Sequence, residues 1–248
     1  MIKIENVVTP SSEQWKEIII GTRSPMNSWG RSDSFCDPIM DNCNDCPDLG
    51  KCAYIFEQGG KPYRSEIGPK DQDLLMRLAK GGPVHAKYRR MIVVYVTITA
   101  PLYWWKEFDT YKVGTVANSC STMHKIADKE FTFEDFSHEK LINSACMEIQ
   151  EQHIRISPIQ ALATTIECLN SYRDLYLQTK DKKYWWQMIQ LLPSSYNQRR
   201  TVMLNYEVLA NMYKSRCNHK LDEWHTFCDW IERLPYSELI IGKTDRAK

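Results

Sequence analysis

The chain has 248 residues, enough for one large domain or two small ones with a buried core. Charged residues make up 25% of it and hydrophobic residues 43%, and the formal net charge is +1. These values are ordinary for a globular protein. They exclude a chain-wide basic field of the kind that binds nucleic acid, and they exclude an acidic solvating tail.

The cysteines and the apolar runs indicate which compartment to expect. The longest apolar run, Met91 to Ala100, is too short to cross a bilayer, and the N-terminus lacks the apolar segment of a signal peptide. Nine cysteines are an odd number, so they cannot all pair within one chain. Without an export signal we expect reduced thiols in a cytoplasmic protein.

The N-terminal part of the sequence predicts a strand, a short helix and a long irregular segment. Residues 1–8 alternate between apolar and polar, as an edge strand does. Ser11 or Ser12 is then placed to cap a helix that ends near Ile20. Residues 21–70 are rich in Gly, Pro, Asp, Asn and Ser, and irregular segments of this length are usually functional or flexible.

The middle of the chain predicts a helix, a strand, a second helix and a loop. Residues 71–80 have helical spacing with an acidic first turn, and two glycines follow. Residues 91–100 are rich in β-branched side chains and predict a strand. Pro101 then stands where it favours the start of a helix through residue 112. The small and polar residues 113–123 predict a loop.

After residue 138 the sequence pattern turns helical. The predicted helices lie near residues 139–152, 158–179, 182–192, 197–216 and 219–233. A few strands followed by many helices predict an α+β architecture. We expect residues 1–248 to form a single domain in which residues 24–68 are an irregular insertion rich in cysteine.

The insertion carries four cysteines within a short stretch: Cys36, Cys43, Cys46 and Cys52. The pair with two residues between them can place two thiolates on one ion, and the Asp and Gly residues around them allow the turns that a metal loop needs. Zinc is the expected metal, an iron–sulfur cluster is the alternative, and an unliganded loop is the third interpretation.

Residues 109–124 read Asp-Thr-Tyr-Lys-Val-Gly-Thr-Val-Ala-Asn-Ser-Cys-Ser-Thr-Met-His. This segment resembles the signature of the flavin-dependent thymidylate synthases, Arg-His-Arg-x-x-Ser-x-Asn-Glu-x-Ser-x-Arg-Tyr. Thr115 stands at the first Ser, Asn118 at the Asn after one inserted residue, and Ser121 at the second Ser. The chain departs from the signature where residues 110–112 replace Arg-His-Arg, Ser119 replaces Glu, and residues 123–124 replace Arg-Tyr.

A second segment adds to this resemblance. The synthases commonly show Leu-Pro and, further on, a helix of the type Asn-x-x-x-Leu-x-Asn-x-x-x-x-Arg. This sequence has Pro193, Asn205, Leu209, Asn211 and Arg216 at the matching spacings. Asn205 and Arg216 are about three helical turns apart, so a continuous helix would present them on one face. The resemblance spans residues 71–235 and is greatest to the divergent members found in phages and prophages.

The resemblance implies a fold with a central, mostly antiparallel sheet and a large helical portion, and it implies a set of binding residues. The phosphate of dUMP would be held by Ser121 and Thr122, and the nucleotide would also contact Arg216 and Glu107, which replaces the usual Gln. The flavin would contact His85, Tyr111, Lys112, Asn118, Asn205 and Asn211. No protein nucleophile is needed.

The implied enzyme transfers a one-carbon unit from methylenetetrahydrofolate to dUMP, with FAD as cofactor and NADPH as reductant. It would be a homotetramer with shared active sites in the cytoplasm of a bacterium or of a phage-infected host. Two alternatives stay open because the signature has lost its arginines. One is altered chemistry on a pyrimidine nucleotide, such as hydroxymethylation, and the other is a non-catalytic nucleotide-binding protein.

Overall fold

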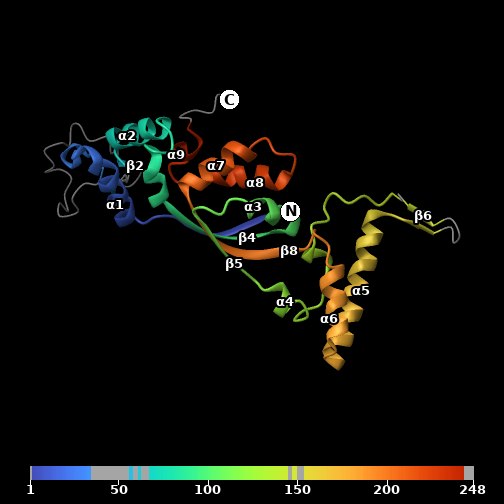
Figure 1. Ribbon diagram of the computed structural model, residues 1–248. Coiled ribbons are helices and arrows are strands. Elements are labelled where there is room, and N and C mark those ends of the chain that lie inside the picture. The colour runs from blue at the N-terminus through green and yellow to red at the C-terminus, as the bar shows by residue number, and fades with distance from the viewer. Residues whose placement is uncertain are drawn as a thin grey trace. The chain divides into compact units, whose positions relative to one another are not determined.

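The computed structural model describes residues 2–34, 56–57, 61–62, 67–144, 147–149 and 154–242 (Figure 1). The chain divides into two compact units. The first unit comprises Met1–Val7, Tyr95–Met203 and His219–Phe227, and the second comprises Val8–Val94, Leu204–Asn218 and Cys228–Lys248. Each unit is therefore assembled from segments that are distant in the sequence.

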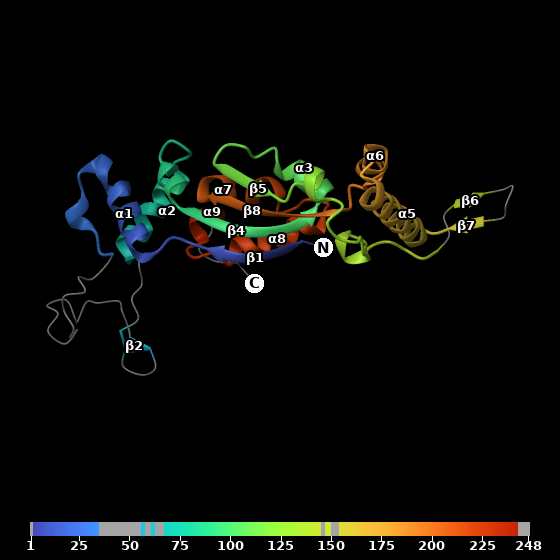
Figure 2. The ribbon, with the colours of Figure 1, turned by 90° about the horizontal axis from the view of Figure 1, so that it is seen from below.

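The main sheet has four antiparallel strands in the order β1-β4-β8-β5 (Figure 2). The strands span Lys3–Val8 (β1), Val93–Pro101 (β4), Asn197–Asn205 (β8) and Thr115–Ser119 (β5). In β4 every second residue from Val94 to Ala100 is fully buried, and in β8 Val202 and Leu204 are fully buried. Because every second side chain is buried against the core, both strands are held as interior strands of the sheet.

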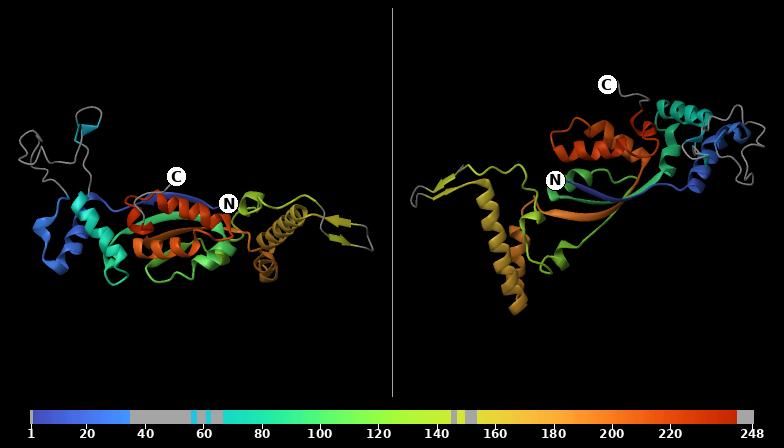
Figure 3. Two further views of the ribbon diagram at one scale, coloured as in Figure 1. Left: turned by 90° about the horizontal axis from the view of Figure 1, so that it is seen from above. Right: turned by 180° about the vertical axis from the view of Figure 1, so that it is seen from behind.

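Two apolar clusters complete the first unit. Helix α3 (Leu102–Phe108) and the part of helix α8 (Asp222–Glu232) up to Phe227 bring aromatic rings together, with the Trp104 and Trp224 centroids 4.9 Å apart. Helices α5 (Pro158–Thr179) and α6 (Lys182–Leu191) form a helical hairpin whose Leu169 and Met188 are fully buried (Figure 3). The short helices are α4 (Thr122–Lys125) and the 3-10 turn Phe133–Asp135, and a small hairpin pairs β6 (Met147–Ile149) with β7 (Ile154–Ile156).

The second unit is mainly helical. Its α-helices are α1 (Ser12–Arg23), α2 (Pro69–Lys80), α7 (Tyr206–Arg216) and α9 (Glu238–Ile241), and its 3-10 turns are Ser24–Met26, Trp29–Arg31 and Ala86–Met91. A two-residue hairpin pairs β2 (Phe56–Glu57) with β3 (Lys61–Pro62). The buried Trp15 ring meets Tyr206 and Tyr236 edge to face, which ties α1 to the C-terminal helices of this unit.

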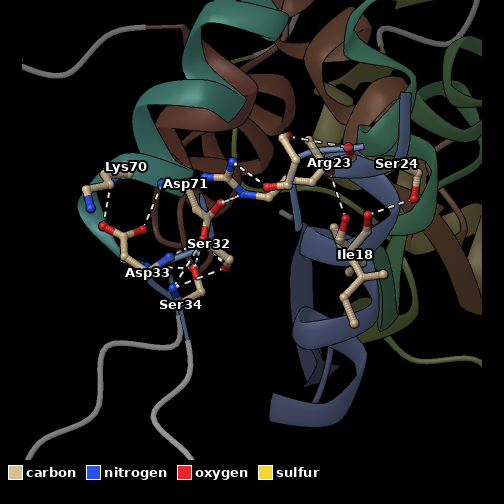
Figure 4. Close-up of polar contacts among 12 residues, drawn as sticks. Ile18, Arg23, Ser24, Ser32, Asp33, Ser34, Lys70 and Asp71 are labelled. Atoms are coloured by element: carbon tan, nitrogen blue, oxygen red, sulfur yellow. Dashed lines mark hydrogen bonds and ion pairs between the residues drawn. The ribbon is translucent and has the colours of Figure 1, made fainter. Parts of the chain in front are cut away.

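A buried polar network centres on Asp71 in the second unit (Figure 4). Its carboxylate accepts hydrogen bonds from Arg23, Ser32 and Ser34. Burial by itself would raise the pKa of Asp71, but these hydrogen bonds and the Arg23 charge outweigh it and lower the pKa. Because the Ser34 hydroxyl also accepts a hydrogen bond from the Gly68 amide at 2.9 Å, residues 34 and 68 are held together.

The α+β fold class predicted from the sequence is confirmed, as is the helix over residues 158–179. Several element predictions are wrong, and three of them missed a strand. Residues 115–119 form a strand rather than a loop, residues 147–149 form a strand rather than part of a helix, and residues 197–205 form a strand rather than the first half of a helix. The third error has a plain cause, since the alternating burial of Val202 and Leu204 in the sheet overrides any local helical preference.

Candidate functional site

The two predicted phosphate-binding residues lie where β5 leads into α4: Ser121 is in the connecting loop, and Thr122 is the first residue of α4. Ser121 caps α4, and its hydroxyl oxygen accepts a hydrogen bond from the His124 amide at 3.3 Å. The Ser121 side chain is exposed, and Thr122 beside it is half-buried. Because the serine oxygen already accepts, its proton remains available to donate to a ligand such as a phosphate.

Strand β8 fixes this loop from the side. The Cys120 amide donates to the Arg199 carbonyl at 3.2 Å. The side-chain amide of Gln198 donates to the Cys120 carbonyl at 3.2 Å and to the Thr122 hydroxyl at 3.3 Å. The backbone around Ser121 is thus attached to the sheet on both its amide and its carbonyl side.

Arg200, two residues further along β8, continues this set of contacts. Its Nε donates to the Gln198 side-chain oxygen at 2.9 Å, and its Nη1 donates to Asp109 at 2.7 Å. The guanidinium carbon lies 4.1 Å from the centroid of the Trp105 ring, which is a close cation–π contact. The side chain of Arg200 is only 14% exposed, so it acts inside the unit and not as a surface charge.

Three predicted flavin-binding residues lie on the segment that follows Asp109. Tyr111 is half-buried, and its ring meets Trp224 edge to face with centroids 6.3 Å apart. The side chains of Lys112 and Asn118 are exposed. Thr115, at the start of β5, has a buried hydroxyl oxygen with no hydrogen-bond partner among the residues that the structure describes. The segment therefore offers a cation, an amide, a ring and an unsatisfied hydroxyl.

Glu107 on α3, predicted to contact the substrate, is bound within its own unit. Its Oε2 accepts a hydrogen bond from the Trp224 indole at 3.0 Å and lies 3.2 Å from His219 Nε2. Tyr111 packs on the same Trp224, so the structure brings the predicted residues Glu107 and Tyr111 to one indole ring. His219 completes this group and had not been predicted.

The remaining nucleotide- and flavin-binding candidates lie in the second unit. Asn205 is the N-cap of α7, where its side chain accepts a hydrogen bond from the Val208 amide at 3.0 Å, and it is therefore not inside the helix as the same-face argument assumed. Asn211 is exposed in the middle of α7, and the half-buried Arg216 is the last helical residue. His85 is exposed at the start of the 3-10 turn Ala86–Met91.

The predicted metal ligands Cys36, Cys43, Cys46 and Cys52 lie outside the described residues. Among the residues that are described, no group of three or more His, Cys, Asp and Glu side chains is placed to hold a metal ion. The metal site stays a prediction from the sequence. Within the same described part of the chain, the helices are all too short or too polar to span a membrane.

A cavity of about 480 Å³ opens in the first unit beside Tyr103, and it also had not been predicted. Its walls combine Lys140 and Lys220 with Asp222 and Glu223. The Tyr103 hydroxyl donates to the Glu223 carboxylate, and burial together with this hydrogen bond raises the pKa of Tyr103 to about 12. Tyr103 is therefore a neutral donor at physiological pH.

Gln198 and Arg200 were missed because the sequence pattern around them was interpreted as helical. In a helix, residues two apart point in different directions, whereas in a strand they share a face. Once residues 197–205 are seen as a strand, Gln198 and Arg200 lie on the same face of β8. Residues 200–204 read Arg-Thr-Val-Met-Leu and do not alternate between polar and apolar, so the only strand signal here was the adjacent β-branched pair Thr201 and Val202.

No family model matches the sequence, and no curated protein matches it either. Solved structures do match the fold. Thymidylate Synthase X from Helicobacter pylori, crystallised with FAD and dUMP, has a TM-score of 0.58 at 14% identity, over 97% of this chain and 96% of that chain. A second structure of the flavin-dependent enzyme from that species, also with FAD and dUMP, gives the same score and identity, over 97% of both chains.

A UMP/dUMP methylase, PolB from Streptomyces cacaoi, bound with 5-Br dUMP, has a TM-score of 0.49 at 11% identity over 94% of this chain and 88% of that chain. The two matches at 0.58 show that this chain has the fold of the flavin-dependent thymidylate synthases along nearly its whole length. This agrees with the fold that the sequence resemblance implied.

Proposed function

We propose that the chain is a flavin-dependent enzyme that transfers a one-carbon unit to dUMP or a closely related pyrimidine nucleotide. The observation that carries the proposal is the likeness of fold, over 97% of the chain, to a synthase crystallised with FAD and dUMP. The match in fold coincides with the two sequence segments that resemble that family, residues 109–124 and 193–216. A fold does not fix its chemistry, and these segments supply the residues to which the proposal assigns the ligands.

The phosphate of the nucleotide is assigned to the loop between β5 and α4. The exposed Ser121 hydroxyl oxygen accepts a hydrogen bond from the His124 amide. The hydroxyl proton can therefore be donated to an acceptor outside the helix, such as a phosphate oxygen. Thr122 offers a second hydroxyl next to it. Arg216 at the end of α7, in the second unit, is assigned separately to a nucleotide contact, because a guanidinium can bind a phosphate or the edge of a pyrimidine with two hydrogen bonds.

The residues present fit a flavin nucleotide in their chemistry. Lys112 and Asn118 are exposed, and they supply a positive charge for a diphosphate and an amide for the polar edge of a ring. The buried Thr115 hydroxyl, which lacks a partner among the described residues, is the kind of group that a bound ligand satisfies. Asn205, in the second unit, is a separate candidate for a flavin contact: its side-chain oxygen accepts from the Val208 amide in the helix cap, and we propose its amide hydrogens as donors to the ligand.

With FAD bound, NADPH would supply reducing equivalents and methylenetetrahydrofolate the carbon, so the hard chemistry belongs to the cofactors. The protein residues bind and orient. Glu107, held by Trp224 and His219, sets a fixed negative charge next to the indole ring on which Tyr111 packs. Rings and fixed charges in such positions orient a planar substrate and stabilise its polarised form.

One observation favours the non-catalytic alternative. Of the three positions where the family signature has Arg-His-Arg, only Lys112 is basic here, and Thr110 and Tyr111 are neutral. A site with fewer cations has less attraction for a dinucleotide, whereas the single phosphate of dUMP needs fewer partners. This interpretation predicts a protein that binds dUMP and does not bind FAD.

The experiment incubates purified protein with FAD, NADPH, methylenetetrahydrofolate and dUMP and identifies the product by chromatography and mass. Formation of dTMP supports the proposal, and 5-hydroxymethyl-dUMP would support altered chemistry on the same substrate. The Ser121→Ala variant should lose most of the turnover at low dUMP concentration. Ser171→Ala, the same change on the exposed surface of α5, is the matched control and should retain it. Absence of both products, with no FAD bound, would remove the enzymatic proposal.

A further inference from the structure

A continuous set of polar contacts joins the C-terminal end of α3 to the loop that carries Ser121. It runs from the Asp109 carboxylate to Arg200, from Arg200 to the Gln198 side-chain oxygen, and from the Gln198 side-chain nitrogen to Cys120 and Thr122. All of its members belong to the first unit. This set of contacts begins beside residues 110–112 and ends at the loop to which the phosphate is assigned.

The donor and acceptor groups around the Gln198 side-chain amide determine which way it is oriented. A guanidinium can only donate hydrogen bonds, so the atom of Gln198 that faces Arg200 Nε must be the oxygen. A backbone carbonyl can only accept, so the atom that faces the Cys120 carbonyl must be the nitrogen. The two ends agree, and a flipped amide would break both bonds.

This orientation determines what the Thr122 hydroxyl can do. Gln198 donates to Thr122 Oγ1 at 3.3 Å, so the threonine oxygen is an acceptor in that contact. The hydroxyl has a single proton, which then remains for another acceptor. If residue 198 were an acceptor, the threonine would donate to it and would have no proton left for a ligand.

We propose that Gln198 and Arg200 are positioning residues that set Thr122 as a hydrogen-bond donor to the phosphate of the bound nucleotide. This inference rests on the proposed function. Arg200 keeps the Gln198 amide in this orientation by donating to its oxygen. Arg200 is itself positioned by Asp109 and by the Trp105 ring, whose centroid lies 4.1 Å from the guanidinium carbon. The same arginine thereby connects the Asp109 end of the flavin-binding segment to the phosphate loop.

The decisive variant is Gln198→Glu, which keeps the size of the side chain and the acceptor for Arg200 but replaces the donating nitrogen with a second acceptor. We expect the dissociation constant for dUMP, measured by calorimetry, to rise at least about tenfold, the loss typical of one hydrogen bond to a charged group. Binding of deoxyuridine, which lacks the phosphate, should not change. Gln187→Glu on the exposed face of α6 makes the same chemical change away from the loop and is the matched control.

A double-mutant cycle tests the mechanism more closely. Thr122→Val removes the same phosphate contact, so Gln198→Glu should add little to the loss in a chain that already carries Thr122→Val. Fully additive losses would contradict the inference, as would equal weakening of dUMP and deoxyuridine, which indicates a general disturbance. If Gln198→Glu does not fold, Arg200→Lys provides the test, because lysine keeps the positive charge but lacks the Nε donor to Gln198. An Arg200→Lys variant that binds dUMP as tightly as the parent would then overturn the inference.

Failure of the inference can be told apart from failure of the proposed function. A parent protein that does not bind dUMP contradicts the proposed function. A parent that binds dUMP, together with a folded Gln198→Glu variant that binds it equally well, contradicts only the role of Gln198 and Arg200.

Discussion

Ser121 and Arg216 are the side chains to which the nucleotide phosphate and the nucleotide edge are assigned, and they lie on different elements. Ser121 caps the short helix α4, and Arg216 ends the longer helix α7. Because their assignments are independent, each can be removed separately. A hydrogen bond to a charged group contributes about 1.5–3 kcal/mol, so each truncation has a measurable effect on binding.

For Arg216→Ala we expect dUMP binding to weaken by about 1.5–3 kcal/mol, because a charged contact to the nucleotide is lost. Isothermal titration with dUMP measures the effect. Lys214→Ala removes an exposed charge two residues earlier in the last turn of the same helix, and it should bind dUMP like the parent. Equal behaviour of the two variants would mean that Arg216 does not contact the nucleotide.

Asn205 combines a structural contact with a proposed binding contact, and two substitutions can separate them. Asn205→Ala removes the cap of α7 and should cost about 1 kcal/mol of stability in chemical denaturation. Asn205→Asp keeps an oxygen for the Val208 amide but has no amide hydrogens, so we expect nearly parental stability and weaker FAD binding. Unchanged FAD affinity in Asn205→Asp would remove Asn205 from the flavin site.

At the scale of elements, the Asp71 carboxylate holds Ser34 (Figure 4), and the Ser34 hydroxyl accepts from the Gly68 amide; these two residues border the cysteine-rich part of the insertion. Asp71→Asn leaves the buried Arg23 charge without its partner, so we expect a loss of about 3 kcal/mol at neutral pH. Asp73→Asn, two residues along α2, breaks an exposed ion pair with Arg77 and should change stability by less than about 0.5 kcal/mol.

The same network predicts a pH dependence. The pKa of Asp71 is lowered in the folded protein, so its stabilisation is present above the ordinary carboxyl pKa and is lost as the pH falls through the folded value. The difference in unfolding free energy between the parent and Asp71→Asn should therefore shrink in acid. Denaturation measured from pH 7 downward checks this, and a difference that stays constant to low pH would show that the carboxylate charge does not matter.

The elements also show what the sequence can and cannot predict. The helix over residues 158–179 was predictable because its Ser157 cap, its proline in the first turn and its helical spacing all agree. Strand β8 was not, because its half-buried residues favour a strand only when β4 and β5 lie on either side of it. The site follows the same division. Ser121 and Arg216 are candidates that motif spacing proposes, whereas the contacts of Gln198 and Arg200 required the strand to be known.

At the scale of the whole molecule, the resemblance to the synthase family predicts a homotetramer in which neighbouring subunits share active sites. We expect light scattering of the purified protein to give four times the chain mass of 29.1 kDa. Assembly of this kind requires large apolar contacts between subunits, so the mass should not depend on salt concentration. A monomer with full dUMP and FAD binding would show that each chain holds a complete site.

The central claim is that this chain binds a flavin and a pyrimidine nucleotide at one site, and a spectroscopic titration tests it most directly. Purified protein is titrated with FAD, and dUMP is then added while the flavin absorbance is recorded. We predict that FAD binds and that dUMP shifts its spectrum, with Ser121→Ala needing more dUMP to produce the shift. A protein that binds no FAD, or one whose bound FAD does not respond to saturating dUMP, would contradict the account.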